Sequence, residues 1–171
     1  LLQGKTTTPA DLVKDLPGNN EAKAETIDNN LQHEIVKKMS SNSVYYGKLS
    51  EMLKKIILQR KIEAMSYEEY LRQVVELAEA ILHPENSGSY PDGIKDSAAR
   101  RALYDHFEAN FELTIDVDGA IRVSIRPEWK RNFQKQQRIR LAIYQKLLLH
   151  SYSEDKATEE TQNVFDIAQR Q

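Results

Sequence analysis

Residues 66–82 read SYEEYLRQVVELAEAIL, and this stretch indicates the fold class. Apolar side chains recur in it every three or four residues, as one face of an α-helix requires. Ser66 stands directly before the run and Glu69 three residues later, which is the spacing of a capping box, in which the glutamate reaches back to the serine amide. The stretch predicts a helix over 67–82 whose buried side holds Tyr67, Tyr70, Leu71, Val74, Ala78, Ile81 and Leu82.

Two more helical patterns precede this one. Residues 22–39 place an apolar side chain at every fourth position, and residues 44–64 carry a second apolar stripe. The polar run SSNS at 40–43 separates them and supplies an N-cap. Because short connections favour antiparallel neighbours, we expect these helices to pack together. The stripe residues are Ile27, Leu31, Ile35, Tyr45, Leu49, Met52, Leu53 and Ile56.

The second half of the chain reads as a loop followed by more helices. Residues 83–96 are rich in Pro, Gly, Ser and Asn, so they predict a loop. Helical patterns return at 97–108 and 154–169, and another helix begins at Phe133 with Asn132 as its N-cap. We therefore expect an all-α fold, a compact bundle of about five to seven helices.

Residues 111–125 are ambiguous. They alternate strictly on both sides of Asp118-Gly119, which is a favourable hairpin turn, so the residues alone predict a β-hairpin. The alternative is a helix with Leu113, Val117 and Ile121 on one face, which the β-branched residues and the mid-helix glycine disfavour.

We expect one helical domain at 22–171, with subunits at about 22–82 and 97–169 joined by the loop 83–96. Residues 1–21 are expected to be a linker or domain edge with at most one short helix at 9–16. The first residue is Leu rather than Met, so we interpret the chain as part of a longer protein.

The composition excludes several classes of function. The 171 residues include no cysteine, so there is no disulfide framework, thiolate nucleophile or cysteine-bound zinc. No apolar run approaches the length of a membrane span, and a cytoplasmic location fits. The four histidines are scattered and no complete phosphate-binding loop is present. We therefore assign no catalytic residue, metal site or cofactor to this chain, and expect no membrane partner.

Positive charge is concentrated in residues 126–148, RPEWKRNFQKQQRIRLAIYQKLL, which we call the basic band. It holds seven Lys or Arg and a single acid in a chain of formal net charge −2. On a helix from Phe133, Lys135, Arg138 and Lys146 share a face and Arg140 lies nearly opposite. Such a row can follow a phosphate backbone, but a solvated helix facing the acidic C-terminal residues fits equally well. The candidate DNA-binding residues are Lys130, Arg131, Lys135, Arg138, Arg140 and Lys146.

Several blocks, in this order, resemble the C-terminal region of the motor (R, or HsdR) subunits of type I restriction–modification enzymes. The resemblance covers about 26–169, and no block in it is a catalytic signature. The blocks are TIDNNLQHEI (26–35), LSEMLKKIILQRK (49–61), YPDGI (90–94), ARRALYD (99–105) and WKRNFQK (129–135).

The resemblance implies a parent subunit with an endonuclease domain and two helicase-like ATPase domains ahead of a helical region. Such a subunit joins the modification and specificity subunits, translocates double-stranded DNA using ATP and Mg²⁺, and cleaves it in a bacterial or archaeal cell. The present chain is similar to the helical C-terminal domain. Its implied roles are assembly with the methyltransferase core and with the remaining domains of the motor subunit, and DNA contact without sequence specificity.

The family pattern Trp-Arg-Gly-Asn-x-x-Lys is matched by Trp129, Asn132 and Lys135, whereas Lys130 and Arg131 replace Arg-Gly. The lost glycine puts a tight turn at this point in doubt. The resemblance also favours helix over hairpin at 111–125, and we expect the helix.

The match at Leu103-Tyr104-Asp105 marks Tyr104 and Asp105, with Trp129 and Asn132, as partner-docking or structural residues. We interpret Asp105 as an acceptor that positions a loop group, and ordinary exposure is the alternative. A lone Trp more often packs in a core than stacks on a base.

An alternative function is a protein-docking module without DNA contact, which would use the basic band and Tyr45, Tyr46, Tyr67, Tyr70 and Tyr104.

Overall fold

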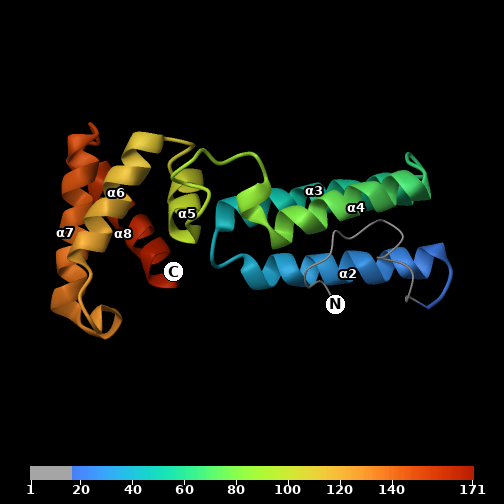
Figure 1. Ribbon diagram of the computed structural model, residues 1–171, viewed down its shortest axis with the longest axis horizontal. Helices are drawn as coiled ribbons and strands as arrows, with labels where there is room; N and C mark the ends of the chain where they lie inside the picture. Colours follow the sequence, from blue (N-terminus) through green and yellow to red (C-terminus); the bar gives the residue numbers. More distant parts are fainter. Residues whose placement is uncertain (1–16) are drawn as a thin grey trace. The chain divides into compact units, whose positions relative to one another are not determined.

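The structure is a computed structural model that describes residues 17–171 (Figure 1). Over these residues the regular secondary structure consists of helices joined by loops, with no strand, so the predicted all-α class is confirmed. The expected helix at 9–16 and most of the linker at 1–21 lie outside the described residues. The α-helices are α2 (Asn20–Lys38), α3 (Ser43–Lys61), α4 (Tyr67–Leu82), α5 (Ala98–His106), α6 (Phe111–Ser124), α7 (Phe133–Leu149) and α8 (Glu154–Arg170), and the 3₁₀ helices are η1 (Pro84–Asn86) and η2 (Trp129–Arg131).

The described residues divide into two compact units. Residues 17–40 and 45–89 form the first unit, and residues 41–44 and 90–171 form the second. The change from one unit to the other therefore falls inside the loop expected at 83–96 and again at the short α2–α3 connection.

The first unit is built from α2, α3 and α4. Its helices form where side-chain caps satisfy free amides: Asn19 accepts a hydrogen bond from the Ala22 amide, and Ser66 accepts one from the Glu69 amide. The Glu69 carboxylate does not reach back to Ser66. It binds Arg72 and Gln73 one turn further on, because a charge-assisted pair is the stronger partner.

A buried polar cluster links the three helices of the first unit. The Asp28 carboxylate on α2 accepts hydrogen bonds from Arg60 Nη2 on α3 and from the Tyr70 hydroxyl on α4, each 2.8 Å long. The Arg60 guanidinium also lies 5.2 Å from the centre of the Tyr70 ring. Burial is the main cause that raises the pKa of Tyr70, and the hydrogen bond to Asp28 adds to it, so this hydroxyl stays protonated and can donate.

In the second unit α7 packs against both α6 and α8 (Figure 1). Ile139, Ile143 and Leu147 are fully buried along one side of it, as their four-residue spacing predicts. The surrounding core is apolar, which gives the unit its main stabilisation. The remaining core residues are Leu103, Phe107, Leu113, Val117, Ile121, Trp129, Ala157, Val164 and Phe165.

Helix α6 settles the ambiguity at 111–125, and the hairpin reading of that segment is wrong. Asn110 caps the helix by accepting a hydrogen bond from the Leu113 amide at 3.1 Å. Asp118, which the hairpin would place in an exposed turn, is buried and accepts from Arg100 Nε at 2.6 Å and Arg122 Nε at 2.8 Å. Arg122 can reach Asp118 in this way because the two lie one helical turn apart. The helix buries Leu113, Thr114, Val117, Asp118 and Ile121 on one face.

Candidate nucleic-acid interface

The basic band begins with a turn that fixes the position of the tryptophan. Glu128 adopts a left-handed conformation with φ of 61°, and η2 follows directly. Arg131, which replaces the family glycine, is not among the described residues with positive φ. The turn therefore forms without glycine at 131, and the backbone strain is carried by Glu128.

Trp129 packs inside the second unit. Only 8 % of its surface is exposed, and its ring meets Phe165 of α8 edge to face with 5.9 Å between centroids. An aromatic pair in this arrangement stabilises a core beyond the area that it buries. The Trp129 side chain anchors the loop 126–132 to α8. The neighbouring cations therefore lie near the N-terminal end of α7.

Asn132 ends the loop and begins α7, as predicted. Its side-chain oxygen accepts a hydrogen bond from the Lys135 amide at 3.0 Å, which satisfies one of the free amides at the helix start. Asn132 thus fixes the residue at which the helical row of cations begins.

Two cations of the C-terminal half of the band turn toward neighbouring helices. The Lys146 ammonium lies 3.8 Å from the Asp116 carboxylate of α6, which His150 also contacts. The Arg140 guanidinium lies 3.7 Å from the centre of the Phe165 ring and donates to Gln162, both on α8. Lys146 therefore contacts α6 and Arg140 contacts α8, so both side chains contribute to the packing of α7 between these helices.

The cations from Lys130 to Arg138 are more open. Lys130 donates to the Gln169 carbonyl and Lys135 to the Pro127 carbonyl, at 2.8 and 2.7 Å. A neutral carbonyl leaves the ammonium charge uncompensated. Arg131 and Arg138 are exposed, and no described residue forms a hydrogen bond or an ion pair with either side chain. The structure thus keeps positive charge available at η2 and the first turns of α7.

Tyr104 and Asp105 lie together on α5. The Asp105 carboxylate accepts from the Tyr90 hydroxyl at 2.5 Å and from the Asn42 amide at 2.6 Å, so it ties two loop segments to the helix. The Tyr104 ring lies edge to face with Tyr90 at 6.1 Å. Both residues are half-buried parts of this local network.

No family model, curated protein or solved structure matches the chain. Among residues 17–171, no helix has the length and apolarity that crossing a membrane requires. In the same part of the chain, no group of three or more His, Asp or Glu side chains is placed to hold a metal ion.

The tyrosines considered for docking are mostly core residues. Tyr45, Tyr46 and Tyr70 are buried in the first unit, where Tyr45 donates to the Ala80 carbonyl. Their rings therefore contribute to the core of the first unit, and a docking role for these three stays a prediction. Tyr67 is half-buried, and its hydroxyl is buried without a hydrogen-bond partner among the described residues.

Sequence reasoning did not single out the exposed lysines of α3. Lys48, Lys55 and Lys61 are all exposed, and Arg60 between them turns inward to Asp28. The signal was present, because residues 44–62 contain five Lys or Arg and one acid.

Proposed function

We propose that the chain is a non-catalytic helical domain of a type I restriction motor subunit. It contributes to assembly with the methyltransferase core and contacts duplex DNA without sequence specificity. The parent subunit would carry the nuclease and the ATP- and Mg²⁺-dependent translocase. The order of the sequence blocks supports the family, and the all-helical fold is compatible with it.

The observation that carries the DNA role is the exposed positive end of the second unit. Arg131 and Arg138 are open to solvent, and Lys130 and Lys135 each donate to a neutral carbonyl. The Lys130 ammonium also lies 5.7 Å from the centre of the Trp129 ring. The amino end of α7 adds the positive end of a helix dipole to the same region. Phosphate contacts of this kind bind any sequence, because they use no base edge.

The structure divides the six candidates into a test set and a matched control set. The test variant reverses Lys130, Arg131, Lys135 and Arg138 to Glu in the full-length motor subunit. The control variant neutralises Arg140 and Lys146 to Gln, since their charges face α8 and α6. We expect the test variant to lose duplex affinity steeply, by about tenfold or more at moderate salt, and the control to retain it.

Assembly with the methyltransferase core is measured on the same proteins by sedimentation, after circular dichroism has shown unchanged helicity. Unchanged DNA affinity of the test variant, within the assembled enzyme, would reject the DNA role. Loss of assembly with intact DNA binding by the isolated motor subunit would instead favour the docking module.

A further inference from the structure

A pocket of about 310 Å³ opens between α5, α6, η2 and the end of α8 in the second unit. Its wall is mainly apolar, and the Trp129 ring forms part of it. The wall continues the hydrophobic core, so filling the pocket would remove more apolar surface from water. Its apolar lining includes Leu103, Ile121, Ile125, Trp129 and Ile167.

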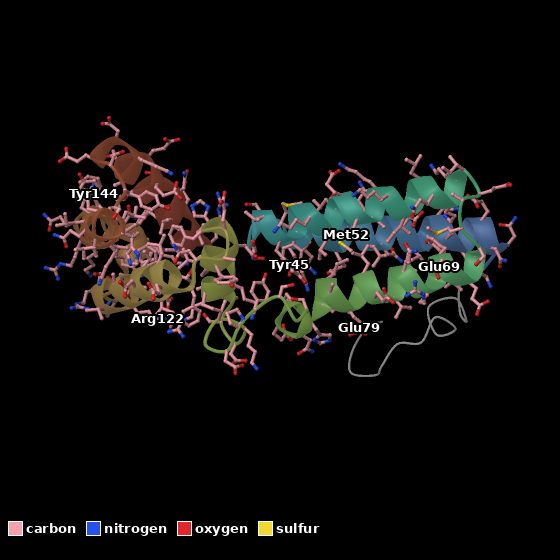
Figure 2. All side chains as sticks on the ribbon, turned by 90° about the horizontal axis from the view of Figure 1, so that it is seen from above. Tyr45, Met52, Glu69, Glu79, Arg122 and Tyr144 are labelled. Carbon is pink, nitrogen blue, oxygen red and sulfur yellow. The ribbon has the colours of Figure 1, made fainter. Side chains whose placement is uncertain are left out.

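Two cations border this apolar space. Arg122, labelled on α6 in Figure 2, has a side chain that is 55 % exposed; its Nε binds Asp118 and its Nη2 lies 3.3 Å from Ser97 Oγ. The Lys130 ammonium donates one hydrogen bond to the Gln169 carbonyl. Both groups retain further N–H donors.

The side chains that line the pocket include two cations and one acid. Asp118 is the one acid in its lining, and it is shared between Arg122 and the Arg100 guanidinium outside the lining. Arg122 and Lys130 are the two cations of the lining. An additional carboxylate at the rim would find donors from Arg122 and Lys130, and a charge-assisted hydrogen bond to either is stronger than a neutral one.

The size of the pocket restricts what can occupy it. A volume of about 310 Å³ is at the lower end for small-molecule sites, which extend to about 1,000 Å³. It matches one large side chain of a protein partner, the kind of anchor that dominates protein interfaces.

The geometry points to a docking pocket for a partner-protein segment in which an aromatic or large aliphatic residue stands next to an acidic one. The apolar side chain would enter beside Trp129, and its acidic neighbour would bind Arg122 and Lys130. This inference rests on the proposed function for the identity of the partner, which would be a methyltransferase subunit.

The pocket is tested first with capped peptides on the 171-residue chain. Trp129 is the only tryptophan of this chain and lines the pocket, so its fluorescence reports occupancy. We expect the peptide acetyl-SGFEGS-amide to give a saturable change. The matched peptides SGFQGS and SGAEGS should bind about tenfold more weakly, because each lacks one of the two features. No saturation, or equal binding of all three peptides, would overturn the inference.

Variants locate the binding. Lys130→Gln should weaken the SGFEGS peptide about tenfold, and Ala99→Phe, which places a ring at the pocket lining, should abolish its binding. Arg138→Gln is the matched control, since Arg138 lies outside the pocket and should leave peptide affinity unchanged. An equal effect of Arg138→Gln would reject the pocket as the site.

Sedimentation of the full motor subunit with the methyltransferase core gives the second readout. Ala99→Phe should weaken assembly at least tenfold. Unchanged assembly, despite lost peptide binding, would reject this pocket as the assembly surface. If the unmodified subunit does not join the core at all, the proposed function fails, and the peptide titration still decides whether the pocket binds such a segment.

Discussion

Arg60 of α3 and Asp28 of α2 form an ion pair 2.8 Å long in which both side chains are more than nine-tenths buried. A second carboxylate, Glu21, also binds Arg60 but is mostly exposed. Asp28 also accepts from the Tyr70 hydroxyl, so the pair connects α2 and α3 with α4. Burying two charges is costly, and the Arg60 Nε remains without a hydrogen-bond partner among the described residues.

Asp28→Asn should lower the free energy of unfolding by about 3 kcal/mol, because the buried Arg60 charge then keeps only the mostly exposed Glu21 as an ionic partner. Urea denaturation followed by circular dichroism measures the change. The double variant Asp28→Leu with Arg60→Met removes both charges and should be less destabilised than Asp28→Asn. A double variant that is less stable than the single one would show that the ion pair is itself a net source of stability.

Tyr70 should make the protein sensitive to alkaline pH. The unfolded chain releases the tyrosine proton near pH 10, whereas burial raises the pKa of Tyr70 above that value in the folded state. Its contribution is therefore complete below about pH 10 and declines as the pH rises further. In Tyr70→Phe, stability at neutral pH should fall by about 1 kcal/mol, because a buried hydrogen bond is lost, and the alkaline decline should become shallower. Equal alkaline slopes in the two proteins would contradict the assignment.

Arg131→Gln and Arg138→Gln should each reduce the dependence of DNA affinity on salt. If each guanidinium contacts one phosphate, the slope of log K against log salt should fall by about 0.9 per substitution. Fluorescence anisotropy with a short duplex, between about 50 and 200 mM salt, measures this slope. Lys146→Gln is the control and should leave the slope unchanged, because Asp116 already lies beside that ammonium.

Arg140 should matter for stability rather than for DNA. Its guanidinium lies over the Phe165 ring, so Arg140→Ala removes both this contact and the packing of the side-chain stem. We expect a loss of about 1–2 kcal/mol in unfolding free energy. Arg140→Met retains the stem and should lose less. Full stability of Arg140→Ala would show that the residue is free to serve another role.

Asn132 should be replaceable only by another capping residue. Asn132→Ala leaves the Lys135 amide without its partner and should cost about 1 kcal/mol, whereas Asn132→Asp retains the acceptor and should be nearly neutral. Thermal unfolding of the two variants, compared with the parent chain, tests the difference. A destabilised Asp variant would indicate that Asn132 Nδ2 has a role of its own.

Much of the helical architecture was predictable, because local signals and tertiary packing agree in it. Ser66, Asn132 and the four-residue spacing of Ile139, Ile143 and Leu147 each indicate helix by themselves. Residues 111–125 are the exception. Their alternation and the Asp118-Gly119 pair favour a hairpin locally. The helix is stabilised by contacts that no local pattern shows, chiefly the hydrogen bonds from two arginines to the buried Asp118 carboxylate.

The charge pattern predicted where cations occur but not which way they point. Arg140 and Lys146 differ from Arg138 only in helical phase relative to α6 and α8, and that phase depends on the tertiary packing. The pocket beside Trp129 was also beyond sequence reasoning, because its lining comes from four separate elements.

The bond from Asn42 to Asp105 has a consequence for dissecting the chain. Residues 41–44 lie between α2 and most of α3 in the sequence, yet they belong to the second unit. The two units are therefore not two consecutive stretches of the chain. A truncation that begins at residue 90 would remove Asn42 and leave Tyr90 as the partner of Asp105. Fragment studies should therefore supply residues 41–44 as a separate peptide, and complementation by that peptide would measure how strongly this short segment is held.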